Sequence, residues 1–326
     1  MKKAMLLVGL VVVVAAFLHL WGGCAGNSNQ PKPLQSLTIA TFSKALGNSP
    51  YHVARHFKWF EEHPSLKGVT ITYKEYNDRP SISDAFSKGE LQVLFSADIP
   101  SIICRAQGND IRIAAVSTSV TQNILVRSDL PFKTLPDLRG KRLAVLQGTS
   151  SHYCLLKVLK GIGMRDTDFE LVYMGAPEAK VAFESGRIDA WAVWAPFVEQ
   201  QEVSGKGRLV VGGDAVINSV MSLSSTFLNQ HENTARGVAA AIQRAKKWMV
   251  EHPEEAQAIA ASELALDPAV VKTAWPKHDW SVVLSESLIP DLQEKADFLA
   301  AADKTRANID VKKDLVDLRF ASQAKP

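Results

Sequence analysis

The run VLQGTSSHYCLLKVL is the segment of this sequence best suited to bind a small anion, because a strand pattern ends in Gly148 and a helical pattern follows. Free N–H groups at a helix start carry partial positive charge and bind anions. Gly148 lets the backbone approach a ligand closely. Thr149, Ser150 and Ser151 add hydroxyl donors, and His152 is a fourth donor or a solvent-facing side chain. The spacing equally fits an ordinary Ser/Thr N-cap, and it lacks the GxxxxGK[ST] pattern of a phosphate loop.

A second candidate binding segment is LFSADIPSIICRAQG, in which a short apolar run precedes another helical pattern. Asp98 is expected to cap this helix, with Pro100 in its first turn, where no amide donor is needed. Ser96 and Ala97 would face the same cleft mouth as the hydroxyl cluster. Asp98 either serves only as the cap or accepts a hydrogen bond from a ligand amine or hydroxyl.

Two further segments supply candidate ligand contacts. The loop TFSKALGNSP carries the polar side chains of Ser43, Asn48 and Ser49 between a strand and a helix start, and we expect Ser49 to cap a helix that runs to about Glu62. In RIDAWAVWAPFVEQ, Trp191 and Trp194 flank a short strand. Both could be core residues, but Trp194 lies at the strand's carboxyl end, where the apolar part of a ligand would rest. We therefore expect Trp194 rather than Trp191 to contact the ligand.

Enzyme and metal chemistry find little support in the sequence. The GxSxG elbow, the HExxH motif and the Gly-rich dinucleotide loop are all absent. His52 and His56 lie four residues apart, but no carboxylate or cysteine completes a metal set, so a solvated helix face is expected. Cys104 and Cys154 fit two isolated core thiols better than a disulfide. We expect no catalysis, no metal and no cofactor.

The elements that would position these residues alternate between β-rich runs and helical patterns. Short strands separated by helices predict an α/β fold with parallel sheets covered by helices on both faces. The pattern occurs twice, over 37–126 and 127–218, and helices dominate afterwards, so two lobes with a cleft between them are expected. Ligands of such sheets bind outside the carboxyl ends of the strands. The expected strands are 37–40, 69–76, 93–95, 111–116, 123–126, 142–146, 170–174, 190–193 and 208–211, and residues 220–223 lead the chain onward into the helical part.

The beginning of the chain has the pattern of an export signal. Two lysines precede an almost unbroken apolar run and the sequence WGGC, as in a secretory signal with small residues before its cleavage site. We expect residues 1–23 to be the signal peptide, Cys24 to be lipidated, and 24–36 to be a flexible tether. A type I signal peptide and an uncleaved anchor helix are the alternatives.

The composition limits the classes of partner. Hydrophobic residues make up 46% and charged residues 22% of the 326 residues, so the chain has the means to build a core rather than remain disordered. With 37 basic and 34 acidic residues the net charge is only +3, which argues against a nucleic-acid-binding surface. Any anion would have to be captured locally.

The sequence around the hydroxyl cluster and the two tryptophans resembles a known family, the periplasmic binding proteins for aliphatic sulfonates, taurine and nitrate. Members typically have G-[ST]-[ST]-x-H near the second-lobe helix, here GTSSH, and later G-x-[IVL]-D-A-W-x-x-W-x-P. The matching residues are Gly186, Ile188, Asp189, Ala190, Trp191, Trp194 and Pro196. The resemblance extends through DLRGKRLAV, AKKWMVEHPEEAQAI and IDVKKDLVD and covers about residues 37–320.

The resemblance implies a two-lobed, type II periplasmic-binding fold in a monomer held at the outer face of a bacterial membrane by its lipid. Lobe one would comprise 37–126 plus 219–326, and lobe two 127–218, with hinges near 125–128 and 216–221. A small anionic ligand would close the lobes, and the closed form would dock on the permease and ATPase subunits of an ABC importer. In this family the helix starts hold the anionic head, and they map here to Ser96, Ala97, Thr149, Ser150 and Ser151. The first loop departs from the family's GYQ-type start.

A sulfonate suits these helix starts, because it is fully ionised and only accepts hydrogen bonds. Nitrate, bicarbonate, a thiamine-type pyrimidine and an aromatic carboxylate are the alternative ligands. Pyrimidine-synthesising enzymes share the fold but carry a cysteine-rich motif that is absent here. A sensory lipoprotein without a permease is a further alternative.

Overall fold

The computed structural model describes residues 33–324 except 43, 302–304 and 306. By its internal contacts the chain divides into 1–33 and 34–326, and the second unit carries all the elements below. The predicted signal peptide, Cys24 and most of the predicted tether therefore lie outside the described residues. Within the described ranges, no helix has both the length and the apolar character that a bilayer crossing requires.

A single mixed sheet runs through the described chain in the order β2-β1-β3-β8-β4-β7-β5-β6, and β9 pairs with β4. Strands β2, β1 and β3 are parallel to one another, as are β7, β5 and β6, whereas β8 and β4 pair with their neighbours antiparallel. The strands are β1 (Ser36–Phe42), β2 (Thr70–Tyr76), β3 (Val93–Ala97), β4 (Ile111–Arg127), β5 (Arg142–Val145), β6 (Glu170–Tyr173), β7 (Ala190–Val193), β8 (Gly207–Ser224) and β9 (His278–Asp279).

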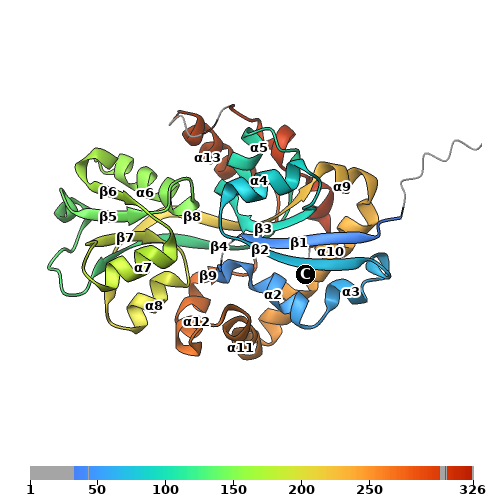
Figure 1. Ribbon diagram of the computed structural model, residues 1–326, viewed down its shortest axis with the longest axis horizontal. Helices are drawn as coiled ribbons and strands as arrows, with labels where there is room; N and C mark the ends of the chain where they lie inside the picture. The colour runs from blue at the N-terminus through green and yellow to red at the C-terminus, as the bar shows by residue number, and fades with distance from the viewer. Residues whose placement is uncertain (1–32, 43, 302–304, 306, 325–326) are drawn as a thin grey trace, which may run out of the picture. The chain divides into compact units, whose positions relative to one another are not determined.

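Helices flank this sheet in both parts of the ribbon in Figure 1, so the expected α/β fold is confirmed. We refer to β1–β3 with their helices as the first half, and to β5–β7 with theirs as the second half. The helices are α2 (Ser49–His56), α3 (Trp59–Glu62), α4 (Arg79–Ser87), α5 (Asp98–Ala106), α6 (Ser150–Gly161), α7 (Ala176–Glu184), α8 (Phe197–Val203), α9 (Ser225–Gln230), α10 (Glu232–Glu251), α11 (Pro253–Leu264), α12 (Pro268–Ala274) and α13 (Ile289–Ala301).

Strands β4 and β8 are long and continuous, although the sequence predicts two short strands in place of β4 and only one, over 208–211, within β8. The segment between the predicted strands of β4 has the polar sequence STSVTQ, which conceals its strand character. The β4–β8 ladder contains four register shifts. Each bulge takes up an extra residue, so the two strands stay paired although their polar and apolar residues do not alternate regularly. The prediction of three short strands was wrong, and both halves share one pair of long strands instead.

Helix α2 differs from its prediction at both ends. The predicted cap, Ser49, is the first helical residue, and Asn48 is the N-cap. The predicted helix over 49–62 breaks at Phe57 and Lys58, because Lys58 adopts a left-handed conformation with φ of 57° and starts α3. Helix propensity does not show this break, since the left-handed residue is a lysine rather than a glycine.

Each half has its own apolar core. In the first half, Tyr51, Phe60 and Phe95 are buried with the alanine-rich face of α10. In the second half, Trp191 is 1% exposed and packs against Phe183. Trp191 is therefore a core residue, as expected.

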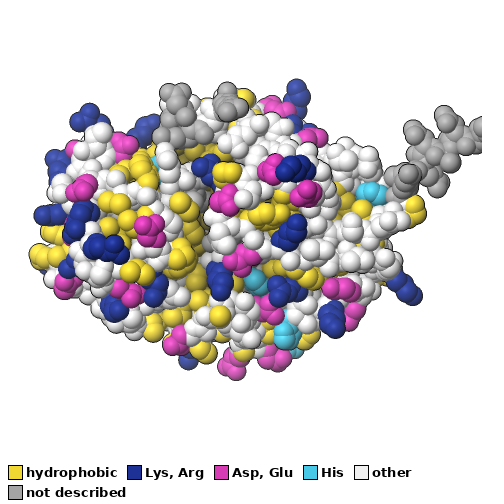
Figure 2. All heavy atoms as spheres, viewed as in Figure 1, with side chains coloured by type: hydrophobic (Ala, Val, Ile, Leu, Met, Phe, Trp, Pro, Cys, Tyr) yellow, Lys and Arg dark blue, Asp and Glu magenta, His cyan; other side chains and the backbone are white. Residues whose placement is uncertain are grey.

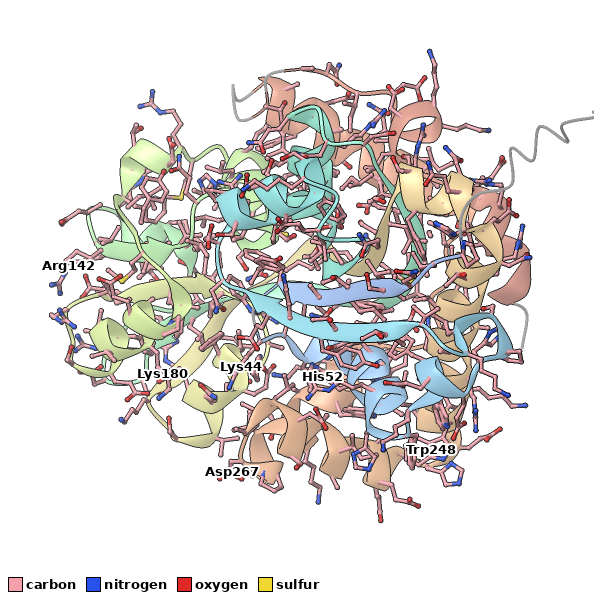
Figure 3. The ribbon with its side chains drawn as sticks, turned by 45° about the vertical axis from the view of Figure 1, so that its right-hand side comes forward. Lys44, His52, Arg142, Lys180, Trp248 and Asp267 are labelled. Atoms are coloured by element: carbon pink, nitrogen blue, oxygen red, sulfur yellow. The ribbon has the colours of Figure 1, made fainter. Side chains whose placement is uncertain are left out.

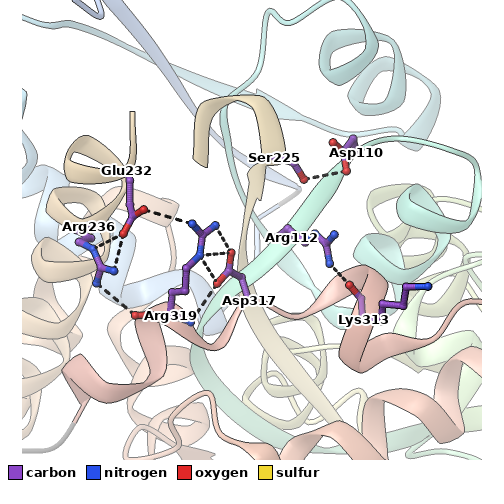
Figure 4. Close-up of polar contacts among 8 residues, drawn as sticks. All are labelled: Asp110, Arg112, Ser225, Glu232, Arg236, Lys313, Asp317 and Arg319. Carbon is purple, nitrogen blue, oxygen red and sulfur yellow. Dashed lines mark hydrogen bonds and ion pairs between the residues drawn. The ribbon is translucent and has the colours of Figure 1, made fainter. Parts of the chain in front are cut away.

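The C-terminal segment returns to the first half, as Figure 4 shows. Arg319 pairs with Asp317 at 2.6 Å and with Glu232 of α10 at 3.3 Å. Arg112 of β4 donates to the carbonyl of Lys313. These contacts attach residues 311–320 to the sheet and to α10, in keeping with a first lobe that includes the chain's end; the lobe boundaries at 126/127 and 218/219 stay a prediction.

The exposed charges are well mixed on the face viewed in Figure 2, where Lys and Arg side chains alternate with Asp and Glu. This arrangement agrees with the small net charge of +3. On that face no concentrated basic surface of the kind that binds nucleic acids is visible.

Candidate functional site

A cavity with an empty volume of about 550 Å³, part of it open to solvent, lies where the two halves meet. Its lining comes from the residues that follow β1, β3, β5 and β7 and from the middle of β4, β8 and β9, which is the carboxyl edge expected for a ligand. The lining residues are Phe42, Ala45, Gly47, Ala97, Pro100, Val120, Thr149, Ser150, Ser151, Trp194, Ala195, Ile217, Ser219 and His278.

The polar wall of this cavity is the N-terminus of α6. Thr149 is the N-cap, and its hydroxyl oxygen accepts from the N–H of His152 at 3.3 Å. Gly148 precedes it with φ of 71°, a left-handed turn that favours glycine. The first N–H groups of the helix, those of Ser150 and Ser151, have no intrahelical acceptor, so they can bind an anion.

The three hydroxyl protons of this wall are already donated to protein acceptors. Thr149 Oγ1 donates to the carbonyl of Leu146 at 2.7 Å. Ser150 Oγ donates to Asp98 Oδ1 and Ser151 Oγ to Gln122 Oε1, both at 3.0 Å. In this conformation the donors available to an anion are therefore backbone N–H groups rather than the hydroxyls.

Asp98 is fully buried behind the wall and does not line the cavity. The N-cap of α5 is Ala97, and Asp98 is its first helical residue, so the prediction that Asp98 caps the helix was wrong. Its Oδ2 forms an ion pair with Lys295 Nζ at 2.6 Å and accepts from the Asn218 N–H at 3.1 Å. Burial alone would lower the pKa of Lys295, but Asp98 and Asp291 outweigh it and raise that pKa.

The opposite side of the cavity is apolar. Trp194 lines it, is partly buried, and packs edge-on against Phe197 with ring centroids 6.0 Å apart. Phe42, Val120 and Ile217 also contribute to this wall. The cavity thus combines one polar end with apolar sides, an arrangement suited to a small amphiphile.

The remaining predicted site residues lie beside the cavity rather than on its wall. Ser49 is buried and donates to the carbonyl of Leu46 at 2.6 Å, and Ser96 bonds within a buried serine cluster. The side-chain nitrogen of Asn48, Nδ2, is buried without a hydrogen-bond partner among the described residues. His152 accepts from the N–H of Gly148 at 3.2 Å through Nδ1. Ser43 lies outside the described residues.

Several residues of the site carry no signal in the sequence. His278 lies in a two-residue strand, and Ser219 lies in the middle of β8. Lys295 reaches Asp98 from 197 positions away. Only the pairing of distant segments brings His278 and Ser219 to the cavity and Lys295 to Asp98 behind its wall, so spacing along the chain could not identify them.

No metal site is found among the residues that the structure describes, since no group of three His, Cys, Asp or Glu side chains could hold an ion. His52, shown on α2 in Figure 3, is 7% exposed, so the expected solvated face was wrong at this residue. Cys104 and Cys154 are buried and free.

Comparisons with known proteins agree with this geometry. A Bacillus subtilis (strain 168) protein with the provisional name aliphatic sulfonates-binding protein is 27% identical over 323 residues, covering 97% of this chain and 96% of its own. The Taurine-binding periplasmic protein of Escherichia coli (strain K12) is 28% identical over 139 residues, 43% of each chain.

Among solved structures, the alkanesulfonate-binding protein SsuA from Xanthomonas axonopodis pv. citri, bound to MOPS, matches with a TM-score of 0.75 at 24% identity. The match covers 86% of this chain and 98% of that protein. The periplasmic nitrate-binding protein NrtA from Synechocystis PCC 6803 matches with a TM-score of 0.74 at 12% identity, covering 91% and 89%. At these identities the likeness shows a shared fold, the two-lobed fold of periplasmic binding proteins.

The relatives by sequence are named as binding proteins and not as enzymes. The model of the family described as NMT1/THI5 like matches residues 48–256, well over half of the sequence. The chain therefore belongs to the NMT1/THI5-like family.

Proposed function

We propose that this chain is the extracytoplasmic solute-binding subunit of an ABC importer and that it captures an alkanesulfonate or taurine by closure of its two lobes. The sulfonate head would bind the free N–H groups at the start of α6, and the carbon chain would lie against Trp194. The protein would act as a monomer and deliver its ligand to the permease and ATPase subunits.

The observation that carries this proposal is the pairing of a helix N-terminus with an apolar wall in one cavity. A sulfonate is ionised at every physiological pH and accepts hydrogen bonds only, so it needs donors and no side-chain acceptor at its head. The α6 start offers backbone donors and the positive end of the helix dipole without a lysine or arginine on the wall.

The relatives support the same ligand class, since two of them are named for aliphatic sulfonates and one for taurine. A sulfonate with a short carbon chain matches both surfaces of the cavity. Nitrate and bicarbonate would fill the polar end and leave the apolar wall without contacts.

A thermal-shift screen of the protein without residues 1–23 tests this proposal directly. The panel is taurine, butanesulfonate, octanesulfonate, nitrate, bicarbonate and a hydroxymethylpyrimidine. A ligand that binds only the native state raises the melting temperature by mass action. We expect sulfonates to raise it and the other ligands to leave it unchanged. A rise with a non-sulfonate alone would keep the fold and overturn the ligand class.

We also propose that Cys24 is lipidated and anchors the protein at the outer face of the membrane. The apolar run followed by Gly22-Gly23-Cys24 supports this proposal. Cys24→Ser should release the protein from the membrane fraction, because a lipid chain supplies most of the binding energy of such an anchor. Fractionation of cells that express each form measures this, and retention of the serine variant would contradict lipid anchoring.

A further inference from the structure

We propose that His278 makes the cavity selective for sulfonates whose carbon chain carries a hydrogen-bond donor, either a hydroxyl or an ammonium group. This inference rests on the proposed function, because it specifies which sulfonates the cavity prefers. Plain alkanesulfonates of the same size would bind more weakly.

The tautomer of His278 follows from its surroundings. The ring nitrogen Nδ1 lies 3.0 Å from the carbonyl oxygen of Ala274. A carbonyl oxygen can only accept, so Nδ1 must carry the proton and donate it. In a neutral imidazole the other nitrogen, Nε2, then bears a lone pair and acts as an acceptor.

Backbone pairing and ring stacking together hold the His278 ring in this orientation. Its backbone lies in β9, where His278 pairs with Val120 of β4. Trp280 stacks on the imidazole with ring centroids 5.0 Å apart and an interplanar angle of 11°. The indole N–H of Trp280 donates to the carbonyl of Trp275 at 3.3 Å, which fixes the stacking partner in turn.

Burial keeps the imidazole neutral at physiological pH. Burial lowers the pKa of His278 to about 4, and the neighbouring charge of Lys277 also lowers it. The hydrogen bond to the carbonyl of Ala274 raises this pKa, but by less. A protonated ring would present a donor at Nε2, whereas the neutral ring presents an acceptor.

A ligand in the cavity would meet the acceptor at Nε2. His278 lines the cavity and retains 7% of its surface exposed, and among the described residues no hydrogen bond to Nε2 is found. The serine and threonine hydroxyls of the α6 wall, by contrast, are all engaged with protein acceptors. A polar atom at a mostly apolar wall is satisfied by ligand or water, so a donor on the ligand would bond there.

Three ligands of nearly equal size distinguish a hydrogen bond to Nε2 from the simple burial of the ligand's carbon chain. 2-Hydroxyethanesulfonate, 2-aminoethanesulfonate and propane-1-sulfonate differ only in whether the terminal group is a hydroxyl, an ammonium or a methyl. Sites built around a hydrogen bond reject the analogue that lacks it. We expect the wild-type protein to bind at least one of the two donor ligands about tenfold more tightly than propane-1-sulfonate, as measured by calorimetry.

Two variants of His278 complete the test. His278→Phe keeps an aromatic ring for stacking on Trp280 but removes the acceptor, so the donor-to-methyl affinity ratio should fall to about one. His278→Gln can place its amide oxygen near the position of Nε2, so it should retain part of the preference. Thermal unfolding without ligand shows whether each variant is folded.

The outcomes are distinguishable. A preference for the hydroxyl or the ammonium ligand that disappears in His278→Phe supports the inference and tells which donor is used. Binding of propane-1-sulfonate as tightly as both donor ligands by the wild type, or an unchanged ratio in a folded His278→Phe, overturns the inference and leaves the proposed function in place. Absence of binding of all three short sulfonates overturns this inference, and the proposed function falls with it only where butanesulfonate and octanesulfonate also fail to bind.

Discussion

At the scale of single residues, Gly148 brings the start of α6 against the first half of the molecule. A Cβ atom added to it would lie 2.7 Å from Nη2 of Arg79, at the start of α4. Arg79 forms no ion pair or hydrogen bond within the described part of the chain, and burial lowers its pKa. The glycine therefore supplies both its left-handed conformation and the space that the guanidinium occupies.

Gly148→Ala should consequently destabilise the protein by more than the roughly 1 kcal/mol cost of a left-handed alanine. Gly68→Ala is the matched control, because Gly68 has φ of 83° but no atom within 4 Å of its added Cβ. Urea denaturation of both variants measures the difference. Equal losses of unfolding free energy would show that Arg79 simply moves aside.

Trp194→Ala should weaken the binding of long-chain sulfonates more than that of short ones. Each methylene removed from water contributes about 0.8 kcal/mol, and the indole supplies the surface that buries it. Calorimetric titration with a chain-length series from C2 to C8 checks this slope. An equal loss of affinity at every length would indicate that Trp194 supports the cavity without contacting the chain.

The types of residue at this site could be predicted from the sequence, but their hydrogen-bond partners could not. Ser150 donates to Asp98, which is 52 positions away in the sequence, and Ser151 donates to Gln122, which is 29 positions away. A helix start rich in hydroxyls is visible in a local pattern, whereas the acceptor that takes each proton depends on the tertiary fold. Competition for those protons decides which donors remain for a ligand.

At the scale of elements, α2 carries a buried histidine whose titration should affect stability. Burial, aided by the charge of Arg55, lowers the pKa of His52 to about 3, although Glu263 lies 4.0 Å from its Nδ1. The unfolded chain binds a proton near pH 6.5, and the folded chain does so only near pH 3. Stability is therefore fully present above pH 6.5 and is lost as the pH falls below it.

Between pH 6.5 and 5, His52→Gln should abolish about 1.5 kcal/mol of the wild-type decrease in unfolding free energy. Guanidinium denaturation at several pH values measures both slopes. His56→Gln serves as the control, since it removes an exposed imidazole from the same helix. A slope in His52→Gln as steep as that of the wild type would mean that His52 is not the group responsible.

The helices and strands were predicted best where a single hydrophobic periodicity runs through the whole element. The strand over 190–193 agrees with its prediction residue for residue. The continuous β4 and β8 and the two-residue β9 could not be predicted, because their pairing partners rather than their own composition keep them extended.

At the scale of the whole molecule, the hydrogen bond from Ser150 to Asp98 joins α6 of the second half to α5 of the first. A ligand shifts an open–closed equilibrium only by its differential affinity for the two states. A hydrogen bond between the two halves that formed only on closure would add to the stability of the closed state without touching the ligand.

Ser150→Ala should therefore weaken sulfonate binding by about 1.5–3 kcal/mol, the value of a hydrogen bond to a charged group. Ser101→Ala is the control, because its hydroxyl bonds only to Ser96 and Ser222 on the first-half side of the sheet. Calorimetry gives the affinities, and small-angle scattering of the unliganded proteins gives the open fraction. Equal affinity losses in both variants would assign the bond from Ser150 to general stability.

The continuity of β4 and β8 also has a mechanical consequence. Two halves joined by flexible linkers could rotate about a few single bonds with almost no restoring force. Here one hydrogen-bonded ladder of two strands passes through both halves, so a relative rotation has to twist or bend that ladder. Under the proposed closure, the ladder would store elastic energy as the halves move away from its relaxed twist and would return that energy when the ligand leaves. The stiffness of the ladder would then set how fast the molecule recovers for its next ligand.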